Sequence, residues 1–102
     1  MSRKEEMDQL ATLQDAVEAQ AANLDPAQRE FVMSEFRTYR WNALKIFEIE
    51  DHVSTDEFDP DMEKKALGER HQLVNENASL FTHIMQWLKG TASTKSELEA
   101  FL

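Results

Sequence analysis

The sequence contains no cysteine and only two glycines and two prolines. Without cysteine, a disulfide framework and cysteine-ligated zinc sites are excluded. The shortage of turn-forming residues argues against a sheet architecture built from many short strands. No apolar run approaches the roughly 18 residues that span a bilayer, and no apolar signal segment follows the first residues. These absences predict a helical protein of the cytoplasm without membrane association.

Acidic residues outnumber basic ones, with 20 Asp and Glu against 11 Lys and Arg, and the net charge is −9. Such a balance argues against a general nucleic-acid coat, because phosphates are neutralised by Lys and Arg. The distribution is uneven, however. Residues 51–63 contain six acids and no Lys or Arg, whereas residues 37–45 contain three cations and no acid. A local basic patch on an acidic body is therefore predicted.

A first helix is predicted over residues 3–22. Ser2 and Glu5 form a capping-box pattern in front of it. Apolar positions recur along it at steps of three and four residues, interrupted by one polar position, Gln14. The members of this row are Met7, Leu10, Gln14, Val17, Ala21 and Leu24.

Two longer helices are predicted over residues 26–51 and 60–89. Each begins with an aspartate cap followed by proline, a residue suited to the first helical position. Gly90 ends the second of them, and residues 52–59 form an acidic loop between the two. Thr94 and Glu97 can cap a short C-terminal helical turn that carries Leu98, Phe101 and Leu102.

The predicted fold is all-α: a single domain of residues 1–102, in which an antiparallel hairpin packs with the N-terminal helix and the short C-terminal turn. Apolar side chains line the hairpin helices in more than one row. Helix two carries the row Val32, Phe36, Tyr39, Ala43 and Ile46. Helix three carries the row Leu67, His71, Val74, Ala78, Phe81, Met85 and Leu88, and a second row of Leu73, Leu80, Ile84 and Trp87.

Three helices alone are not expected to cover all these rows, which predicts self-association or a protein partner. The candidate interface residues are Phe36, Tyr39, Phe47, Phe81, Trp87 and Phe101. His71 is interpreted as a core or interface histidine, because it lies on an apolar row. Gly68 is interpreted as a weak point of its helix or a close packing contact.

No pattern for catalysis or metal binding is present. His71 and His83 are twelve residues apart on a predicted helix, too far to share an ion, and Glu-x-x-His is missing. The acidic segment lacks the glycine of a calcium loop. No phosphate-binding glycine loop or nucleophile elbow occurs. A protein that is not an enzyme, with no cofactor and no metal, is predicted.

Arg37, Trp41 and Lys45 are four residues apart and share one helix face, with Arg40 beside them. Arginine and an aromatic ring on one face can hold a phosphate or stack on a base, so these four residues are the candidate DNA-binding site. Two alternatives remain: a solvated face whose arginines pair with nearby acids, and a protein interface anchored by Trp41.

Residues 31–98 resemble the small terminase subunits of tailed phages. The likeness is carried by Arg37-Thr38-Tyr39-Arg40-Trp41, Asp59-Pro60, the segment of residues 70–74, and the run of residues 88–95. The resemblance implies an oligomeric ring in the host cytoplasm that recognises phage DNA and passes it to the packaging motor, with no catalytic site of its own. An acidic helical module that binds a host or phage protein, as an inhibitor or adaptor, is the alternative. A homo-oligomer whose only partner is itself is a third interpretation.

Overall fold

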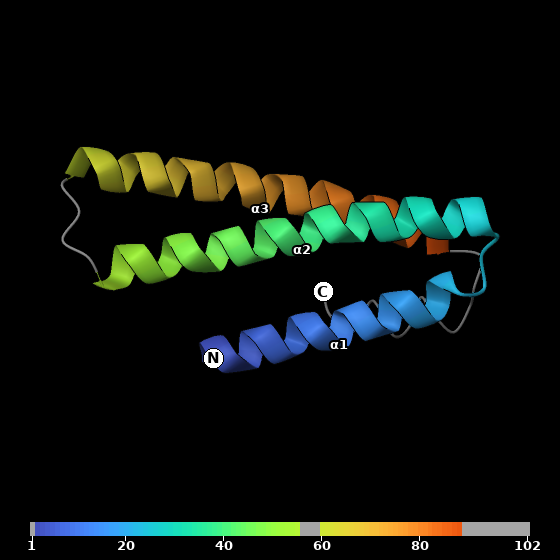
Figure 1. Cartoon of the computed structure of the whole chain (residues 1–102). Helices are drawn as coiled ribbons and strands as arrows, with labels where there is room; N and C mark the ends of the chain where they lie inside the picture. Colours follow the sequence, from blue (N-terminus) through green and yellow to red (C-terminus); the bar gives the residue numbers. More distant parts are fainter. Residues whose placement is uncertain (1, 56–59, 89–102) are drawn as a thin grey trace.

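Three α-helices make up nearly all of the described chain: α1 (Arg3–Ala21), α2 (Pro26–Thr55) and α3 (Pro60–Leu88) (Figure 1). The computed structural model describes residues 2–55 and 60–88. Those residues contain no strand. The prediction of an all-α fold, with an N-terminal helix beside a long antiparallel hairpin, is confirmed. The predicted C-terminal turn lies outside the described residues.

Helices α1 and α2 begin at the caps expected from the sequence. Ser2 Oγ accepts a hydrogen bond of 3.2 Å from the backbone N–H of Glu5. Asp25 Oδ1 accepts one of 2.9 Å from the backbone N–H of Gln28. Each cap satisfies an N–H group that has no partner inside the first turn of its helix.

Arg29 closes the turn between α1 and α2. Its guanidinium donates to the backbone carbonyls of Ala21, Ala22 and Leu24 at 3.3, 3.2 and 3.4 Å. The carbonyls of Ala21 and Ala22 lie at the end of α1, where no following helical N–H group is left to bond them, and that of Leu24 lies in the turn. A cation at this end of α1 also complements the helix dipole. The turn therefore needs no glycine, and no described residue has a positive φ.

Helix α2 ends at Thr55 rather than at residue 51, so the predicted loop of residues 52–59 begins too early. Acidic composition alone does not stop a helix, and no glycine or proline occurs between Pro26 and Pro60. His52 in the last turn is also placed favourably for the helix dipole when protonated. Helix α3 begins at Pro60, as predicted, and its predicted end at residue 89 lies outside the described residues.

The three helices differ in length, and this decides which surfaces are covered. Helix α1 has 19 residues and is about 28 Å long, whereas α2 has 30 residues and is about 45 Å long. Helix α1 runs beside α2 and leaves the far end of the hairpin without a third helix (Figure 1). At that end Met62 and Leu67 are 56% and 44% exposed.

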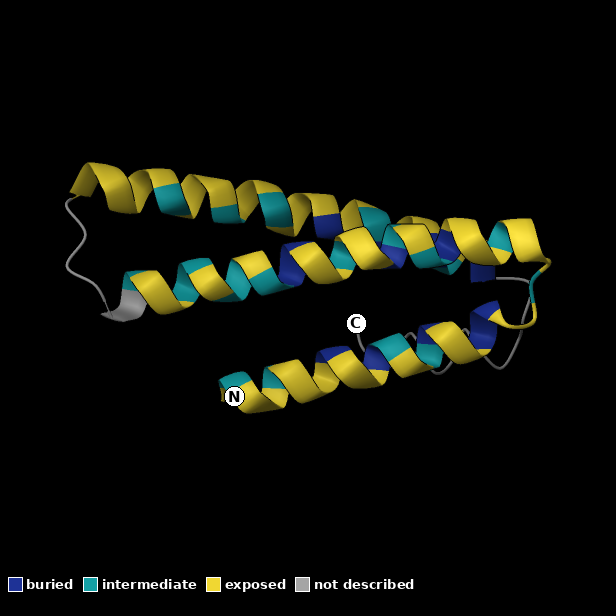
Figure 2. Ribbon diagram, viewed as in Figure 1, coloured by how far each residue is buried: buried dark blue, intermediate teal, exposed yellow. Residues whose placement is uncertain are grey.

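The core lies between the facing sides of the three helices (Figure 2). On α2 the predicted apolar row is confirmed, since Val32, Phe36 and Ala43 are buried. The ring of Tyr39 lies between two other rings, with centroids 5.6 Å from Phe36 and 6.0 Å from Phe81. The buried apolar residues are Leu10, Leu13, Val17, Ala21, Val32, Phe36, Ala43, Phe81, Ile84 and Leu88.

The first apolar row predicted for helix three is buried only at its C-terminal end. His71 is exposed, and Val74 is 39% exposed, so the core interpretation of His71 is wrong, while the interface interpretation stays a prediction. The reason is that α1 packs mainly on α2 and makes few contacts with α3. Of the two interpretations of Gly68, the close packing contact is wrong, because a Cβ atom there would meet nothing within 4 Å; the weak point of the helix stays a prediction.

Two buried asparagines align the hairpin helices. Asn42 Nδ2 donates to Glu76 Oε1 at 3.0 Å, and Asn77 Nδ2 donates to the backbone carbonyl of Tyr39 at 3.1 Å. Both asparagines are less than a tenth exposed. A buried amide without a partner costs free energy, so a shifted pairing of α2 with α3 would be penalised at both places.

Candidate binding surfaces

The four residues predicted to contact DNA all lie on the outer face of α2. Arg37, Arg40, Trp41 and Lys45 are exposed, and Trp41 is 64% exposed. We call these four residues the basic face. The opposite side of α2 packs on α1 and α3, because residues such as Phe36 and Ala43 point inward. None of the three described helices therefore covers the basic face.

The cations of the basic face are not equivalent. Arg37 Nη2 lies 2.9 Å from Glu30 Oε1, and both side chains are more than 60% exposed. An ion pair so open to water contributes about 1 kcal/mol at most, and it partly neutralises Arg37. Arg40 and Lys45 belong to none of the ion pairs formed among the described residues. They are the cations most available to an anionic ligand.

The predicted interface residues divide into core and surface positions. Phe36 and Phe81 are 1% and 9% exposed, and Tyr39 is half-buried between their rings. Phe36 and Phe81 are thus core residues of the single chain rather than exposed interface candidates. Their side chains pack against the facing helices. Sequence periodicity shows which residues share a face, but not whether a neighbouring helix covers that face. Phe101 lies outside the described residues.

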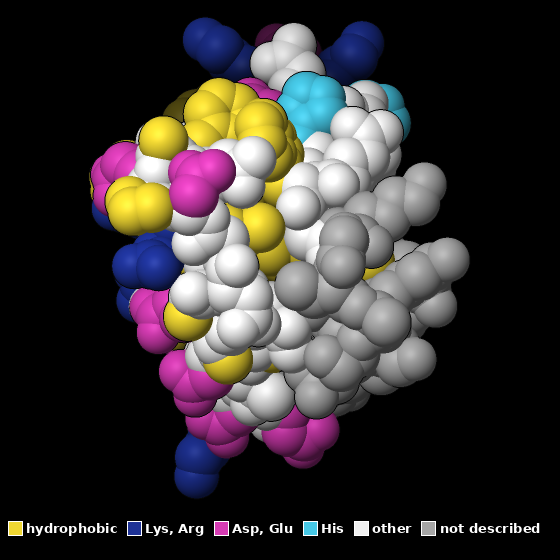
Figure 3. Space-filling view, turned by 90° about the vertical axis from the view of Figure 1, so that its right-hand side faces the viewer, with side chains coloured by type: hydrophobic (Ala, Val, Ile, Leu, Met, Phe, Trp, Pro, Cys, Tyr) yellow, Lys and Arg dark blue, Asp and Glu magenta, His cyan; other side chains and the backbone are white. Residues whose placement is uncertain are grey.

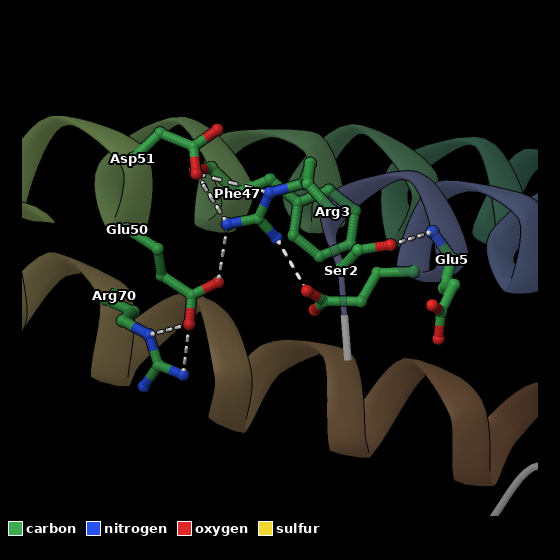
Figure 4. Close-up of polar contacts among 8 residues, drawn as sticks. Ser2, Arg3, Glu5, Phe47, Glu50, Asp51 and Arg70 are labelled. Atoms are coloured by element: carbon green, nitrogen blue, oxygen red, sulfur yellow. Dashed lines mark hydrogen bonds and ion pairs between the residues drawn. The ribbon is translucent and has the colours of Figure 1, made fainter.

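Phe47 belongs to a polar cluster that joins α1 to the hairpin (Figure 4). The Arg3 guanidinium lies 4.2 Å above the Phe47 ring and donates to Asp51 Oδ1 at 2.9 Å. The hydrogen bond to Asp51 raises the pKa of Arg3. Glu50 lies 3.4 Å from Arg3 and accepts from Arg70 of α3 at 2.8 and 3.0 Å. The cluster thereby connects all three helices.

The sequence alone does not reveal this cluster. It shows only an arginine at the start of α1 and a pair of acidic residues late in α2, 47 and 48 residues further along the chain. Only the antiparallel placement of the two helices brings these charges together.

An aromatic pair lies at the end of the molecule where α1 turns into α2. The ring centroids of Phe31 and Trp87 are 5.1 Å apart, and the two residues are 47% and 40% exposed. Figure 3 shows hydrophobic side chains gathered on this end, above a lower part rich in acidic side chains. Exposed tryptophan is frequent at protein interfaces. Of the predicted interface residues that the structure describes, Trp87 is the most exposed, so it is the one most accessible to a partner.

A groove of about 590 Å³ runs between α1 and α3, and α2 forms its floor. Leu10 and Leu13 line it from α1, Val74 and Phe81 from α3, and Tyr39 and Phe47 from α2. The sequence alone does not reveal this groove, because the groove depends on the distance between α1 and α3, which make few contacts with each other. Its lining is mostly apolar.

Burial raises the pKa of Tyr39 above its ordinary value of about 10. The unfolded chain then loses this proton at a lower pH than the folded chain, so the contribution of Tyr39 to stability is complete below about pH 10 and falls above it. We expect Tyr39→Phe to remove this alkaline loss. The free energies of unfolding of the two proteins should converge, or cross in favour of the variant, between about pH 9 and pH 11.

Urea unfolding across this range measures the effect. Lysine titration occurs in both proteins and cancels in the comparison. Stability curves that stay parallel up to the highest pH would contradict the burial of the Tyr39 hydroxyl. The chain contains one tyrosine, so tyrosinate absorbance reports this residue alone.

The described residues form no group of three or more side chains suited to a metal ion. Nor does any described helix combine the length and apolarity needed to cross a bilayer. No family model, curated protein or solved structure matches the chain. The class that the fold defines is a three-helix bundle built on a long antiparallel hairpin.

Proposed function

We propose that this protein is a non-catalytic helical subunit that recognises DNA through the basic face of α2 and acts as a homo-oligomer in genome packaging, in the manner of a small terminase subunit. The observation that carries the proposal is the exposure of Arg40, Trp41 and Lys45 together on one helix face. Cations neutralise phosphates, and a tryptophan ring can stack on a base.

The acidic remainder of the chain limits what one copy can do. With a net charge of −9 the chain as a whole repels phosphate, and Arg37 of the basic face is partly neutralised by Glu30. Two or three phosphate contacts per copy make binding weak and sensitive to salt. An oligomer presents several basic faces to one DNA molecule, and linked contacts multiply affinity. The oligomer and the DNA site therefore belong to one proposal.

The test is retention of a double-stranded DNA oligonucleotide as a function of salt. We expect Arg40→Gln with Lys45→Gln to weaken binding and to reduce the magnitude of the slope of log K against log salt by about 2. Lys64→Gln with Lys65→Gln is the matched control, because it makes the same charge change at exposed positions on α3. The control pair should leave the slope unchanged.

Two results would overturn the DNA proposal. One is the absence of DNA retention at low salt by a chain that light scattering shows to be a monomer. The other is an equal loss of DNA affinity in both double variants, which would mean that net charge alone, and not the basic face, determines the affinity.

A second candidate function is a protein-binding module, such as an inhibitor or adaptor. The observation in its favour is the exposure of Trp41 and Trp87, at 64% and 40%, on an acidic chain that can steer onto a basic partner. It predicts a stoichiometric protein partner whose binding is lost on Trp41→Ala, while thermal stability is unchanged and DNA is not retained. A partner bound equally by wild type and the Trp41 and Trp87 variants would exclude this role for the two tryptophans.

A further inference from the structure

The outer side of α1 carries two aspartates without an ion-pair partner among the described residues. Asp8 and Asp15 are exposed, and a spacing of seven residues places them on one side of the helix. Between them lie the small side chains of Ala11 and Thr12, which are also exposed. We call these four residues the acidic face. Figure 2 shows that the side of α1 turned away from α2 is exposed, so none of the described helices covers it.

The acidic face has the spacing of the basic face with the opposite charge. On α2, Arg37 and Lys45 lie eight residues or about 12 Å apart, and Trp41 lies midway between them. On α1, Asp8 and Asp15 lie seven residues or about 10 Å apart, and only small residues separate them on the acidic face. The Trp41 ring, which is 64% exposed, can therefore lie over small side chains while each cation meets a carboxylate.

We propose that the basic face of one copy packs on the acidic face of a second copy, with α2 of the first antiparallel to α1 of the second. The occupant of the basic face is then another copy of this chain. Matching positions of opposite charge favour this contact and oppose the pairing of two like faces. The ion pair of Arg37 with Glu30 does not prevent it, because a pair more than 60% exposed on both sides exchanges partners readily.

Charges next to the two faces select the antiparallel orientation. In it, Lys4, one turn before the acidic face, lies opposite Glu48, one turn after the basic face, and the two attract. In the parallel orientation Glu18 would lie opposite Glu48, and Lys4 would be level with Met33, which carries no charge. Glu5 lies at the edge of the antiparallel contact, as Glu18 does in the parallel one, so Lys4 makes the difference.

A basic face that is covered in this way is closed to DNA. This consequence, unlike the contact itself, rests on the proposed function: DNA and a second copy compete for Arg40, Trp41 and Lys45. The aspartates of the acidic face take the place of phosphates. The contact joins different surfaces of the two copies, so it can continue from copy to copy. Copies that share one DNA molecule are then held together by other surfaces.

Charge reversal and its rescue test the contact by sedimentation equilibrium at low salt without DNA. Wild type should associate, and salt should weaken the association, because the charges are exposed. Arg37→Glu with Lys45→Glu should raise the dissociation constant about tenfold or more, and so should Asp8→Lys with Asp15→Lys. An equimolar mixture of the two double variants should associate again, since each basic face then meets an acidic one. Circular dichroism checks that both variants are folded.

Each double variant has a matched control on α3. Lys64→Glu with Lys65→Glu repeats the charge change of the basic-face variant, and Glu63→Lys with Glu69→Lys repeats that of the acidic-face variant, all at exposed positions. Both controls should associate as wild type does. A wild type that stays monomeric at low salt, a mixture that fails to associate, or equal losses in variants and controls would overturn the contact.

The orientation is tested by disulfide formation in this cysteine-free chain. Copies with Ala19→Cys are mixed with copies that carry either Ser34→Cys or Glu48→Cys, all at exposed positions. The antiparallel contact brings residue 19 level with residue 34, and the parallel contact would bring it level with residue 48. Mass spectrometry should find the mixed disulfide with Ser34→Cys only. A mixed disulfide with Glu48→Cys alone would overturn the antiparallel orientation.

DNA retention separates this inference from the proposed function. Asp8→Lys with Asp15→Lys keeps the basic face and should retain DNA more tightly than Glu63→Lys with Glu69→Lys, because no second copy competes. Equal retention would overturn the competition. If copies associate but no variant retains DNA, the proposed DNA binding falls and the contact stands. If DNA is retained but wild type does not associate without it, the contact falls and the proposed DNA binding stands.

Discussion

Replacement of Phe36 by alanine is expected to lower the free energy of unfolding by about 3–5 kcal/mol. The Phe36 side chain is 1% exposed and is among the largest fully buried side chains. Its ring lies 5.6 Å from that of Tyr39, at an interplanar angle of 23°. Truncation removes apolar contacts and leaves a cavity that rigid neighbouring helices cannot fill completely.

The expected loss is large compared with the whole stability of such a domain, about 5–15 kcal/mol. The midpoint of thermal unfolding should fall by about 12 °C or more, since a chain of this size loses about 4–8 °C for each kcal/mol. Urea unfolding followed by circular dichroism gives the free energy, and a thermal scan gives the midpoint.

Phe31→Ala is the matched control, because it removes the same side chain five residues earlier on the same helix. Phe31 is 47% exposed and contacts Trp87, so we expect a loss of about 0.5–1.5 kcal/mol from the aromatic pair. Similar losses for the two variants would contradict the placement of Phe36 in the core.

Replacement of Val17 by aspartate should undock α1 from the hairpin. Val17 is 0% exposed, and it lies in the middle of the buried face of α1. The change removes about 1.5–3 kcal/mol of apolar burial and adds about 1–3 kcal/mol for burying a polar group without a partner. Keeping α1 docked would therefore cost about 2.5–6 kcal/mol, so α1 leaves the bundle and keeps the carboxylate in water.

Ala19→Asp is the control for this change. It places the same residue on the same helix at an exposed position, so the burial cost disappears. The loss of helix propensity is larger in the control, because alanine is a better helix former than valine. Hydrogen exchange should show loss of protection in α1 for Val17→Asp and little change for Ala19→Asp. Equal effects of the two variants would mean that helix propensity, rather than docking on α2, holds α1 in place.

Local features of the structure were largely predictable from the sequence, because they depend on neighbouring residues. Ser2 and Asp25 cap their helices as their spacing to Glu5 and Gln28 suggests. The buried row of α2 follows helical periodicity. The predicted boundary at residue 51 is wrong, because an acidic run does not stop a helix, and α2 continues to Thr55 in the absence of glycine or proline.

The candidate site was predictable in part. Arg37, Arg40, Trp41 and Lys45 share a face through their spacing alone, and the structure leaves that face exposed. One alternative from the sequence was a solvated face whose arginines pair with nearby acids, and Arg37 does pair with Glu30. Which acid it meets depends on rotamers, which the sequence does not specify.

Neighbouring residues along the chain suffice to predict the helices, the caps of α1 and α2, and the existence of several apolar rows. Which rows are buried depends on how the helices pack: Ile84 is fully buried, whereas Val74 is 39% exposed. The tertiary structure also decided that Asn77 is buried and that Arg3 meets Asp51. The physical reason is that periodicity specifies which residues share a face, while the length and position of a neighbouring helix specify which faces lose their water.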